Sequence, residues 1–145
     1  MLKILFRVVA LVMMFQLTGC DDETSSDVDT KRSLLTTNTW GNPVVTHADG
    51  NLSADYHDFV ITFTNNPVIS GYEGTYIISN GGHAFEDPSG QWKLNEEQTL
   101  IIFDSGREIQ FEVSEDRLKL DFTVTDSGGR LSGLSGHFVF ELKPI

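Results

Sequence analysis

The sequence has one cysteine, Cys20, in 145 residues. A single thiol cannot close an intramolecular disulfide or build a multi-thiolate metal site, so the fold depends on burial and hydrogen bonding. Basic residues are also scarce: ten Lys and Arg stand against 21 Asp and Glu, for a net charge of −11. Because nucleic-acid phosphates are bound by clustered Lys and Arg, we expect no nucleic-acid partner.

The chain also lacks an apolar run long enough for a permanent membrane span. Its N-terminal apolar stretch, Val8 to Leu17, is short and follows two cations, Lys3 and Arg7, as in a secretory signal peptide. The stretch ends in Leu17-Thr18-Gly19-Cys20, which resembles the lipobox of bacterial lipoproteins. The resemblance implies that residues 1–19 are removed and that Cys20 becomes diacylglyceryl-modified and N-acylated.

The segment after the cysteine is polar and acidic. Removal of residues 1–19 takes away two basic residues and no acid, so 126 residues with eight basic and 21 acidic side chains, net charge −13, remain. Residues 20–33 contain few apolar side chains, so we expect a lipidated cysteine followed by a flexible acidic tether. Association with the membrane should come from the acyl chains, since the acidic domain would be repelled by anionic lipid.

Two features bear on location within the envelope. Asp21 directly after the lipidated cysteine resembles an inner-membrane retention signal of some bacteria, whereas the run Asp21-Asp22-Glu23 resembles a surface-export signal of others. We expect the outer membrane, and the acidic run leaves a surface-facing orientation open.

From residue 34 onward the sequence has no sustained helical period. Apolar side chains instead recur at every second position, which predicts half-buried antiparallel strands. The strands are expected over residues 40–46, 59–64, 75–79, 90–94, 99–103, 108–113, 118–125 and 138–143. Short turns rich in Gly, Asn, Asp and Pro separate them, which favours sequential hairpins in an up-and-down barrel or a sandwich. We expect an all-β, eight-stranded antiparallel barrel over residues 34–145, because closure removes unpaired strand edges.

Several short sequences resemble the lipocalin-like domains of envelope lipoproteins from Gram-negative bacteria. They are Leu34-Leu35 followed by Trp40, Phe59 to Phe63, Gly90 to Asn95 before Thr99 to Phe103, and Glu115 to Leu120. The resemblance covers roughly residues 34–143 and implies a lipocalin-like barrel with a general capacity for ligand binding. It assigns no binding residue by position.

The alternation defines a set of side chains expected inside the barrel. They are Phe59, Ile61, Phe63, Tyr76, Ile78, Trp92, Leu94, Leu100, Ile102, Ile109, Phe111, Val113, Leu118, Leu120, Phe122, Val124, Phe138, Phe140 and Leu142. An eight-stranded barrel either holds one small ligand or is filled by its own side chains. In the first case the ligand is apolar and contacts Tyr76, Trp92, Phe111 and Phe122. In the second case the protein is a non-enzymatic interaction module whose loops bind an unknown protein partner.

No sequence motif indicates an enzyme, a cofactor or a metal. His47 and His57 flank a loop with Asp49, Asp55 and Asp58, but the spacing matches no metal motif. Gly133 to His137 departs from the Gly-x-Ser-x-Gly nucleophile elbow, and no helix follows it. In the Gly-rich run 128–136, Leu131 and Leu134 are expected as half-buried anchors or as a lid or partner contact. We therefore expect a protein without catalytic, cofactor or metal residues.

Overall fold

The computed structural model describes residues 23–125 and 135–145. The predicted signal peptide, Cys20, and the two loop leucines Leu131 and Leu134 therefore lie outside the described residues. The elements are α2 (Glu23–Thr37), β1 (Thr39–His47), β2 (Gly50–Asn51), β3 (Val60–Phe63), β4 (Gly74–Ser79), β5 (Ser89–Leu94), β6 (Leu100–Phe103), β7 (Glu108–Val113), β8 (Leu118–Val124) and β9 (Gly136–Pro144).

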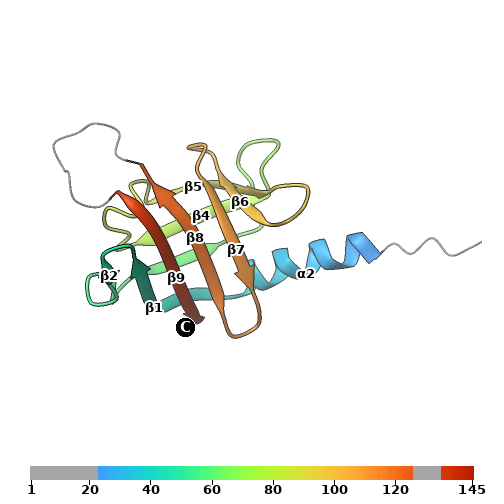
Figure 1. The fold of residues 1–145 in the computed structure, drawn as a ribbon. Helices are drawn as coiled ribbons and strands as arrows, with labels where there is room; N and C mark the ends of the chain where they lie inside the picture. Colours follow the sequence, from blue (N-terminus) through green and yellow to red (C-terminus); the bar gives the residue numbers. More distant parts are fainter. Residues whose placement is uncertain (1–22, 126–134) are drawn as a thin grey trace, which may run out of the picture.

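The strands form a closed antiparallel barrel, as predicted (Figure 1). Strands β1 and β3 to β9 pair with their neighbours in sequence order, and β1 also pairs with β9, which closes the sheet. The short β2 pairs with the end of β1 and stands outside this ring of eight. Closure gives each of the eight strands two neighbours and so removes the edges that an open sheet would expose.

The first strand is irregular. The β1–β9 register shifts between Gly41 and Val44, a stretch that contains Pro43, and Asn42 has a φ of 49°. Because proline has no N–H to donate to the ladder, the strand accommodates it in a bulge.

Because every pairing is antiparallel, the connections alternate between the two ends of the barrel. Residues 64–73, 95–99 and 114–117 connect strands at the end where α2 enters, here called the helix end (Figure 1). Residues 48–59, 80–88 and 104–107 connect strands at the opposite end, here called the distal end.

The helix α2 includes most of the segment that was expected as a tether, up to Ser33. The last turns of this helix are attached to the helix end. Arg32 Nε donates to Glu73 Oε2 at 2.9 Å, and Lys31 Nζ donates to the Gln98 carbonyl at 3.1 Å. Leu35 is fully buried and its carbonyl accepts a hydrogen bond from Trp40 Nε1 at 3.1 Å. Local composition missed these long-range contacts, which offset the entropy of ordering a polar helix.

Most of the predicted interior is confirmed, with one register error. In β6, the buried side chains are Ile101 and Phe103, whereas Leu100 and Ile102 are partly exposed. Trp92 pairs with Phe103 and Leu94 pairs with Ile101 across the β5–β6 ladder. A shift of one residue turns every side chain of a strand to the opposite face, and four consecutive apolar residues give no alternation from which to choose the face.

Candidate functional site

The distal half of the barrel interior is lined by aromatic rings. The distal aromatic cluster consists of Tyr56, Phe59, Phe85, Phe122, Phe138 and Phe140, all buried. Ring centroids lie 5.0 Å apart for Tyr56 and Phe140, 5.0 Å for Phe59 and Phe140, and 4.9 Å for Phe85 and Phe122. These separations are those of interacting aromatic pairs, so the cluster is a packed apolar layer beneath the distal connections.

Three members of this cluster come from connections rather than from strands. Tyr56 and Phe59 lie in the connection between β2 and β3, and Phe85 lies in the connection between β4 and β5. Phe85 is 5% exposed, and Ala84 beside it is fully buried. The segment of residues 81–85, here called the plug, therefore fills the distal end of the barrel from above.

Arg107 holds the plug from the β6–β7 connection. Its Nη1 donates to the Ala84 carbonyl at 2.5 Å. The guanidinium carbon lies 5.8 Å from the ring centroid of Phe85 and 5.7 Å from that of Phe122. Within the part of the chain that the structure describes, no carboxylate forms an ion pair with Arg107. A cation that contacts two aromatic faces and one carbonyl is thus placed at the distal end of an acidic protein.

Tyr76 brings a second polar group to the same end. Its side chain is fully buried and stacks on Phe103 with ring centroids 3.8 Å apart and an interplanar angle of 15°. Its hydroxyl has no hydrogen-bond partner among the described residues. Burial raises the pKa of Tyr76 to about 12, and the nearby negative charges of Asp104 and Asp87 add to the rise.

Glycine at position 90 creates the space for this hydroxyl. A Cβ at Gly90 would overlap Asp104 Oδ1 and lie 2.8 Å from the Tyr76 hydroxyl oxygen. The tyrosine side chain therefore crosses β5 at the one position where no side chain obstructs it. This crossing places the phenol oxygen next to the β6–β7 connection that carries Arg107.

The four residues predicted to contact a ligand lie at three places in the barrel. Tyr76 and Phe122 approach the distal end, where both lie near Arg107. Trp92 is buried in the helix half, with Nε1 donating to the Thr64 carbonyl at 3.1 Å and its ring 5.5 Å from that of Phe63. Phe111 is buried in the core and also borders a hollow over β6, β7 and β8. The structure thus brings Tyr76 and Phe122 together at the distal end and places Trp92 and Phe111 elsewhere.

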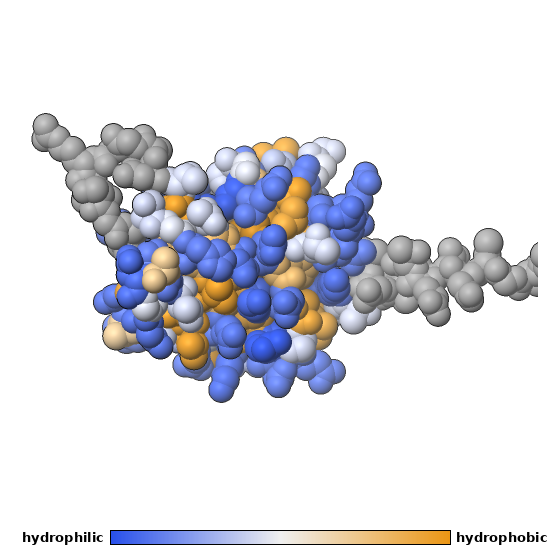
Figure 2. Space-filling view, viewed as in Figure 1, coloured by the Kyte–Doolittle hydropathy of each residue, from blue (hydrophilic) through white to orange (hydrophobic). Residues whose placement is uncertain are grey.

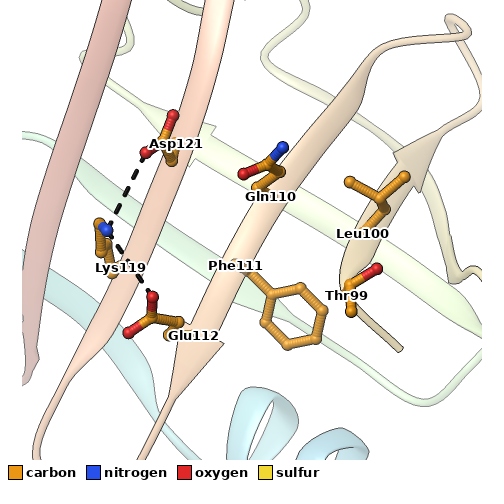
Figure 3. A pocket seen from close by; sticks show the side chains of 7 residues that line it. All are labelled: Thr99, Leu100, Gln110, Phe111, Glu112, Lys119 and Asp121. Carbon is orange, nitrogen blue, oxygen red and sulfur yellow. Dashed lines mark ion pairs between the residues drawn. The ribbon is translucent and has the colours of Figure 1, made fainter. Parts of the chain in front are cut away.

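The outer hollow lies across β6, β7 and β8 and has a volume of about 480 Å³ (Figure 3). Its lining consists of Thr99, Leu100, Gln110, Phe111, Glu112, Lys119 and Asp121. Lys119 Nζ lies 3.7 Å from Glu112 Oε1 and 3.9 Å from Asp121 Oδ2, so its charge is already paired. On this face hydrophobic surface shows between hydrophilic side chains (Figure 2). The hollow is a mixed polar surface and shares only Phe111 with the predicted ligand contacts.

Sequence reasoning missed Phe85, Ala84 and Arg107 at the distal end. Period-two alternation finds interior residues on strands, and these three lie on connections. The available signal was the apolar pair Ala84-Phe85 within a polar connection that begins Asn80-Gly81-Gly82 and ends Asp87-Pro88. Large apolar residues in a short polar loop must either be exposed or fold back onto the core.

His47, His57 and His137 each lie beside a different carboxylate, those of Asp49, Asp58 and Asp121. His47 is buried beside Phe138, with ring centroids 4.4 Å apart, and its Nδ1 accepts from the Asp49 backbone N–H at 3.2 Å. His57 is exposed and its Nε2 lies 2.9 Å from Asp58 Oδ2. Among the residues described, no three His, Cys, Asp or Glu side chains gather as they would around a metal ion. His137, beside the glycine-rich run, pairs with Asp121 at 2.6 Å on the outer face.

Comparison with known proteins gives no relative. No protein-family model matches the chain, and neither the curated proteins nor the solved structures contain a significant match. Among the helices that the structure describes, none has the length and apolar character needed to cross a membrane.

Proposed function

We propose that this protein is a lipid-anchored lipoprotein of the cell envelope whose lipocalin-like barrel binds or carries a small apolar ligand at the distal end. The observation that carries the proposal is the composition of that end. An aromatic layer is combined there with two polar groups, the unpartnered Tyr76 hydroxyl and the Arg107 guanidinium. Apolar walls with a few convergent polar groups are the usual composition of a small-molecule site.

The lipid anchor rests on the N-terminal sequence. Lys3 and Arg7 precede the apolar stretch from Val8 to Leu17, and the lipobox-like Leu17-Thr18-Gly19-Cys20 follows. Acyl chains on Cys20 would hold the protein to the membrane, since two or more chains anchor stably whereas one anchors marginally. The helix α2 that follows the anchor is attached to the helix end, so the distal end is the one farther from the attachment point.

The proposed location is the outer membrane, with the surface-facing orientation open. The acidic run Asp21-Asp22-Glu23 supports export toward the surface, while Asp21 alone resembles the inner-membrane signal of other bacteria. Fractionation of the two membranes and protease accessibility on intact cells separate these locations.

The proposal includes no catalytic role. Phenol, guanidinium and aromatic rings bind and orient a ligand, but the distal end contains no nucleophile held by an adjacent base among the residues described. Tyr76 can serve as a hydrogen-bond donor, because a tyrosine with the ordinary pKa of 10.0 is protonated at neutral pH and burial raises the pKa of Tyr76 further, to about 12.

The direct test is native mass spectrometry of the full chain purified in detergent from an envelope fraction. A reproducible bound mass of a few hundred daltons, lost in Phe122→Ala and retained in Phe63→Ala, is the expected result. Phe122 lies in the distal aromatic cluster and Phe63 is an equally buried ring beside Trp92. A bare protein mass in all three forms would contradict ligand carriage.

A second candidate function is a non-enzymatic interaction module, and the dense packing of the interior favours it. The rings of Phe85, Phe122, Phe138 and Phe140 contact one another across the distal half. In this case Phe122→Ala lowers only stability, by about 3–5 kcal/mol, and leaves no ligand affinity to lose. Crosslinking of the full chain in intact envelopes would then recover a defined protein partner.

A further inference from the structure

The plug differs from the rest of the core in how it is held. Its ring packs against Phe59, Phe122 and Phe140, with centroids 5.2, 4.9 and 5.4 Å from that of Phe85. Its backbone belongs to no strand and makes one internal hydrogen bond, from the Phe85 N–H to the Gly81 carbonyl at 3.1 Å. An apolar ring is thus inserted into the core on a segment outside the β-ladder.

The base of the connection is fixed independently of the plug. The Ile78 N–H donates to the Pro88 carbonyl at 2.7 Å, and Asn80 Nδ2 donates to the Asp58 carbonyl at 2.9 Å. Between these fixed points, Asn80 and Gly82 have φ values of 56° and 54°. The hydrogen bonds at the base of the connection thus do not involve residues 81–85, so a displacement of the plug would not require breaking the pairing of β4 with β5.

Gly81 shows how closely the plug fits. A Cβ at this position would lie 2.7 Å from the Phe85 Cβ and 2.9 Å from Ile78 Cγ2. These distances are too short for any real Cβ contact, so the closed position of the plug requires glycine at position 81. One added methyl group would push the plug outward and leave the Phe85 ring intact.

The plug presents a ring and a carbonyl oxygen to the barrel, and the Ala84 backbone also forms a hydrogen bond with Tyr56. The ring occupies the space between Phe59, Phe122 and Phe140, and the carbonyl of Ala84 accepts from Arg107 Nη1. If the plug leaves, Arg107 loses this acceptor and the three rings lose a neighbour. The Tyr76 hydroxyl, which has no partner among the described residues, provides a further donor nearby.

We infer that the distal end is a binding site for a small ring-containing molecule with a carbonyl or carboxylate oxygen, and that the plug occupies it in the ligand's place. The inference rests on the proposed function and specifies its ligand class and its closed state. The ligand's ring replaces that of Phe85, and its oxygen replaces the Ala84 carbonyl on Arg107. Because the ligand competes with the plug, its apparent affinity is proportional to the fraction of molecules in which the plug is out.

The test uses two probes with the same apolar body, 4-phenylbutanoate and 4-phenylbutan-2-one, titrated by calorimetry into the full chain in detergent against protein-free micelles. Phe85→Ala empties the ring position and is expected to raise the affinity for both probes at least tenfold. Phe63→Ala removes an equally buried ring in the helix half and should change neither affinity by more than twofold. Equal gains in the two variants would show an unspecific cavity and overturn the inference.

Two further variants keep the test independent of one substitution. Gly81→Ala displaces the plug without removing an aromatic ring and should also raise both affinities, which covers the case in which Phe85→Ala does not fold. Arg107→Met in the Phe85→Ala background should lower both affinities at least tenfold, with a larger loss for the carboxylate if charge contributes. Circular dichroism checks the fold of each variant, and an unchanged affinity in Arg107→Met overturns the assigned polar contact.

Failure of this inference and failure of the proposed function give different results. A wild-type chain that carries a ligand from the envelope, with no gain in Phe85→Ala or Gly81→Ala, overturns the plug and leaves ligand carriage standing. A wild-type chain that carries none, with no gain in either variant, overturns both.

Discussion

Tyr76 combines complete burial with a hydroxyl that has no partner among the described residues. A buried hydroxyl without a hydrogen bond is unfavourable for folding, so such a group is retained only where something else benefits from it. The two residues that make its position feasible are Gly90, which leaves room for the side chain, and Phe103, on which the ring stacks. At this scale the molecule therefore contains a polar group that stability alone does not explain.

The missing partner of the Tyr76 hydroxyl predicts the effect of Tyr76→Phe on stability. Because the lost hydroxyl has no partner, the substitution should leave the free energy of unfolding at pH 7 unchanged or raise it by up to about 1 kcal/mol. The folded-state pKa of Tyr76 is about 12, above its ordinary value of 10.0. The titration of Tyr76 therefore leaves the free energy of unfolding unchanged below pH 10 and lowers it as the pH rises from 10 through about 12, because the unfolded chain loses the phenol proton first.

The measurement is denaturant unfolding at pH 7 and across pH 9–12, with absorbance titration of the phenols in parallel. The wild type should lose stability over this window and Tyr76→Phe should lose less. Tyr56 also has a raised pKa through burial and contributes the remaining slope. If the free energy of unfolding depended equally on pH in the wild type and in Tyr76→Phe, the raised pKa would not belong to Tyr76.

Gly74 gives a second prediction at the residue scale. A Cβ at this position would overlap the Thr64 carbonyl oxygen and lie 2.8 Å from Trp92 Nε1, which donates to that oxygen. Gly74→Ala should therefore separate β3 from β5 locally and cost about 3 kcal/mol or more, at the upper end of overpacking effects. Gly41→Ala is the control, because its nearest atom is the tip of the exposed Ile145 side chain. Similar losses in urea unfolding for both variants would argue against this explanation.

At the scale of elements, β6 shows how pairing decides what a strand buries. Leu100, Ile101, Ile102 and Phe103 are all apolar, yet the β5–β6 register turns Ile101 inward and Ile102 outward. The turn before β6 contains Gln98 with a φ of 53°, and the Asn95 carboxamide accepts from the N–H groups of Thr99 and Leu100. The turn thus contributes to the register on which the burial depends.

The register predicts opposite results for two neighbouring substitutions. Ile101→Asp places a charge in the core and should abolish folding at 37 °C, because an unpaired buried charge is strongly destabilising. Ile102→Asp, on the outer face, should leave the fold intact with a change within about 1 kcal/mol. Thermal unfolding followed by circular dichroism distinguishes the two. The reverse order of stabilities would show that the register is shifted by one residue.

The attachment of α2 gives the second prediction at this scale. Leu35 is fully buried, so Leu35→Ala should lower the free energy of unfolding by about 2–5 kcal/mol. Arg32→Gln removes the partly exposed ion pair with Glu73 and should cost no more than about 1 kcal/mol. Urea unfolding of both variants compares the stabilisation from the burial of Leu35 with that from the ion pair between Arg32 and Glu73. A larger effect for Arg32→Gln would mean that charge rather than burial attaches the helix.

At the scale of the whole molecule, attachment and binding are assigned to opposite ends. The chain enters the barrel through α2 at the helix end, and the aromatic layer with Tyr76 and Arg107 lies at the distal end (Figure 1). In the proposed mature form, which lacks residues 1–19, the net charge of −13 would oppose contact of the barrel with anionic lipid. Membrane association should therefore depend on Cys20 alone.

The corresponding prediction concerns Cys20→Ser in a bacterium that expresses the chain. The variant should leave the envelope pellet or accumulate as an unprocessed precursor, whereas the wild type sediments with the membranes and incorporates labelled palmitate. Arg107→Met serves as the control and should remain membrane-bound, because it changes only the distal end. Palmitate labelling of Cys20→Ser would contradict lipidation at this residue.

The sequence by itself determined the all-β class, the number of strands in the barrel and most of its interior. Alternation along a strand is a local property, since adjacent side chains point to opposite faces whatever the rest of the chain does. The tertiary structure decided three further features. The polar segment before Leu35 is helical, and Ile101 rather than Ile102 faces the interior. Phe85 and Arg107 lie together above Phe122. Each of these features depends on contacts between residues that are distant in sequence. The candidate site lies among these features, because loop residues have no period and the packing between connections fixes their positions.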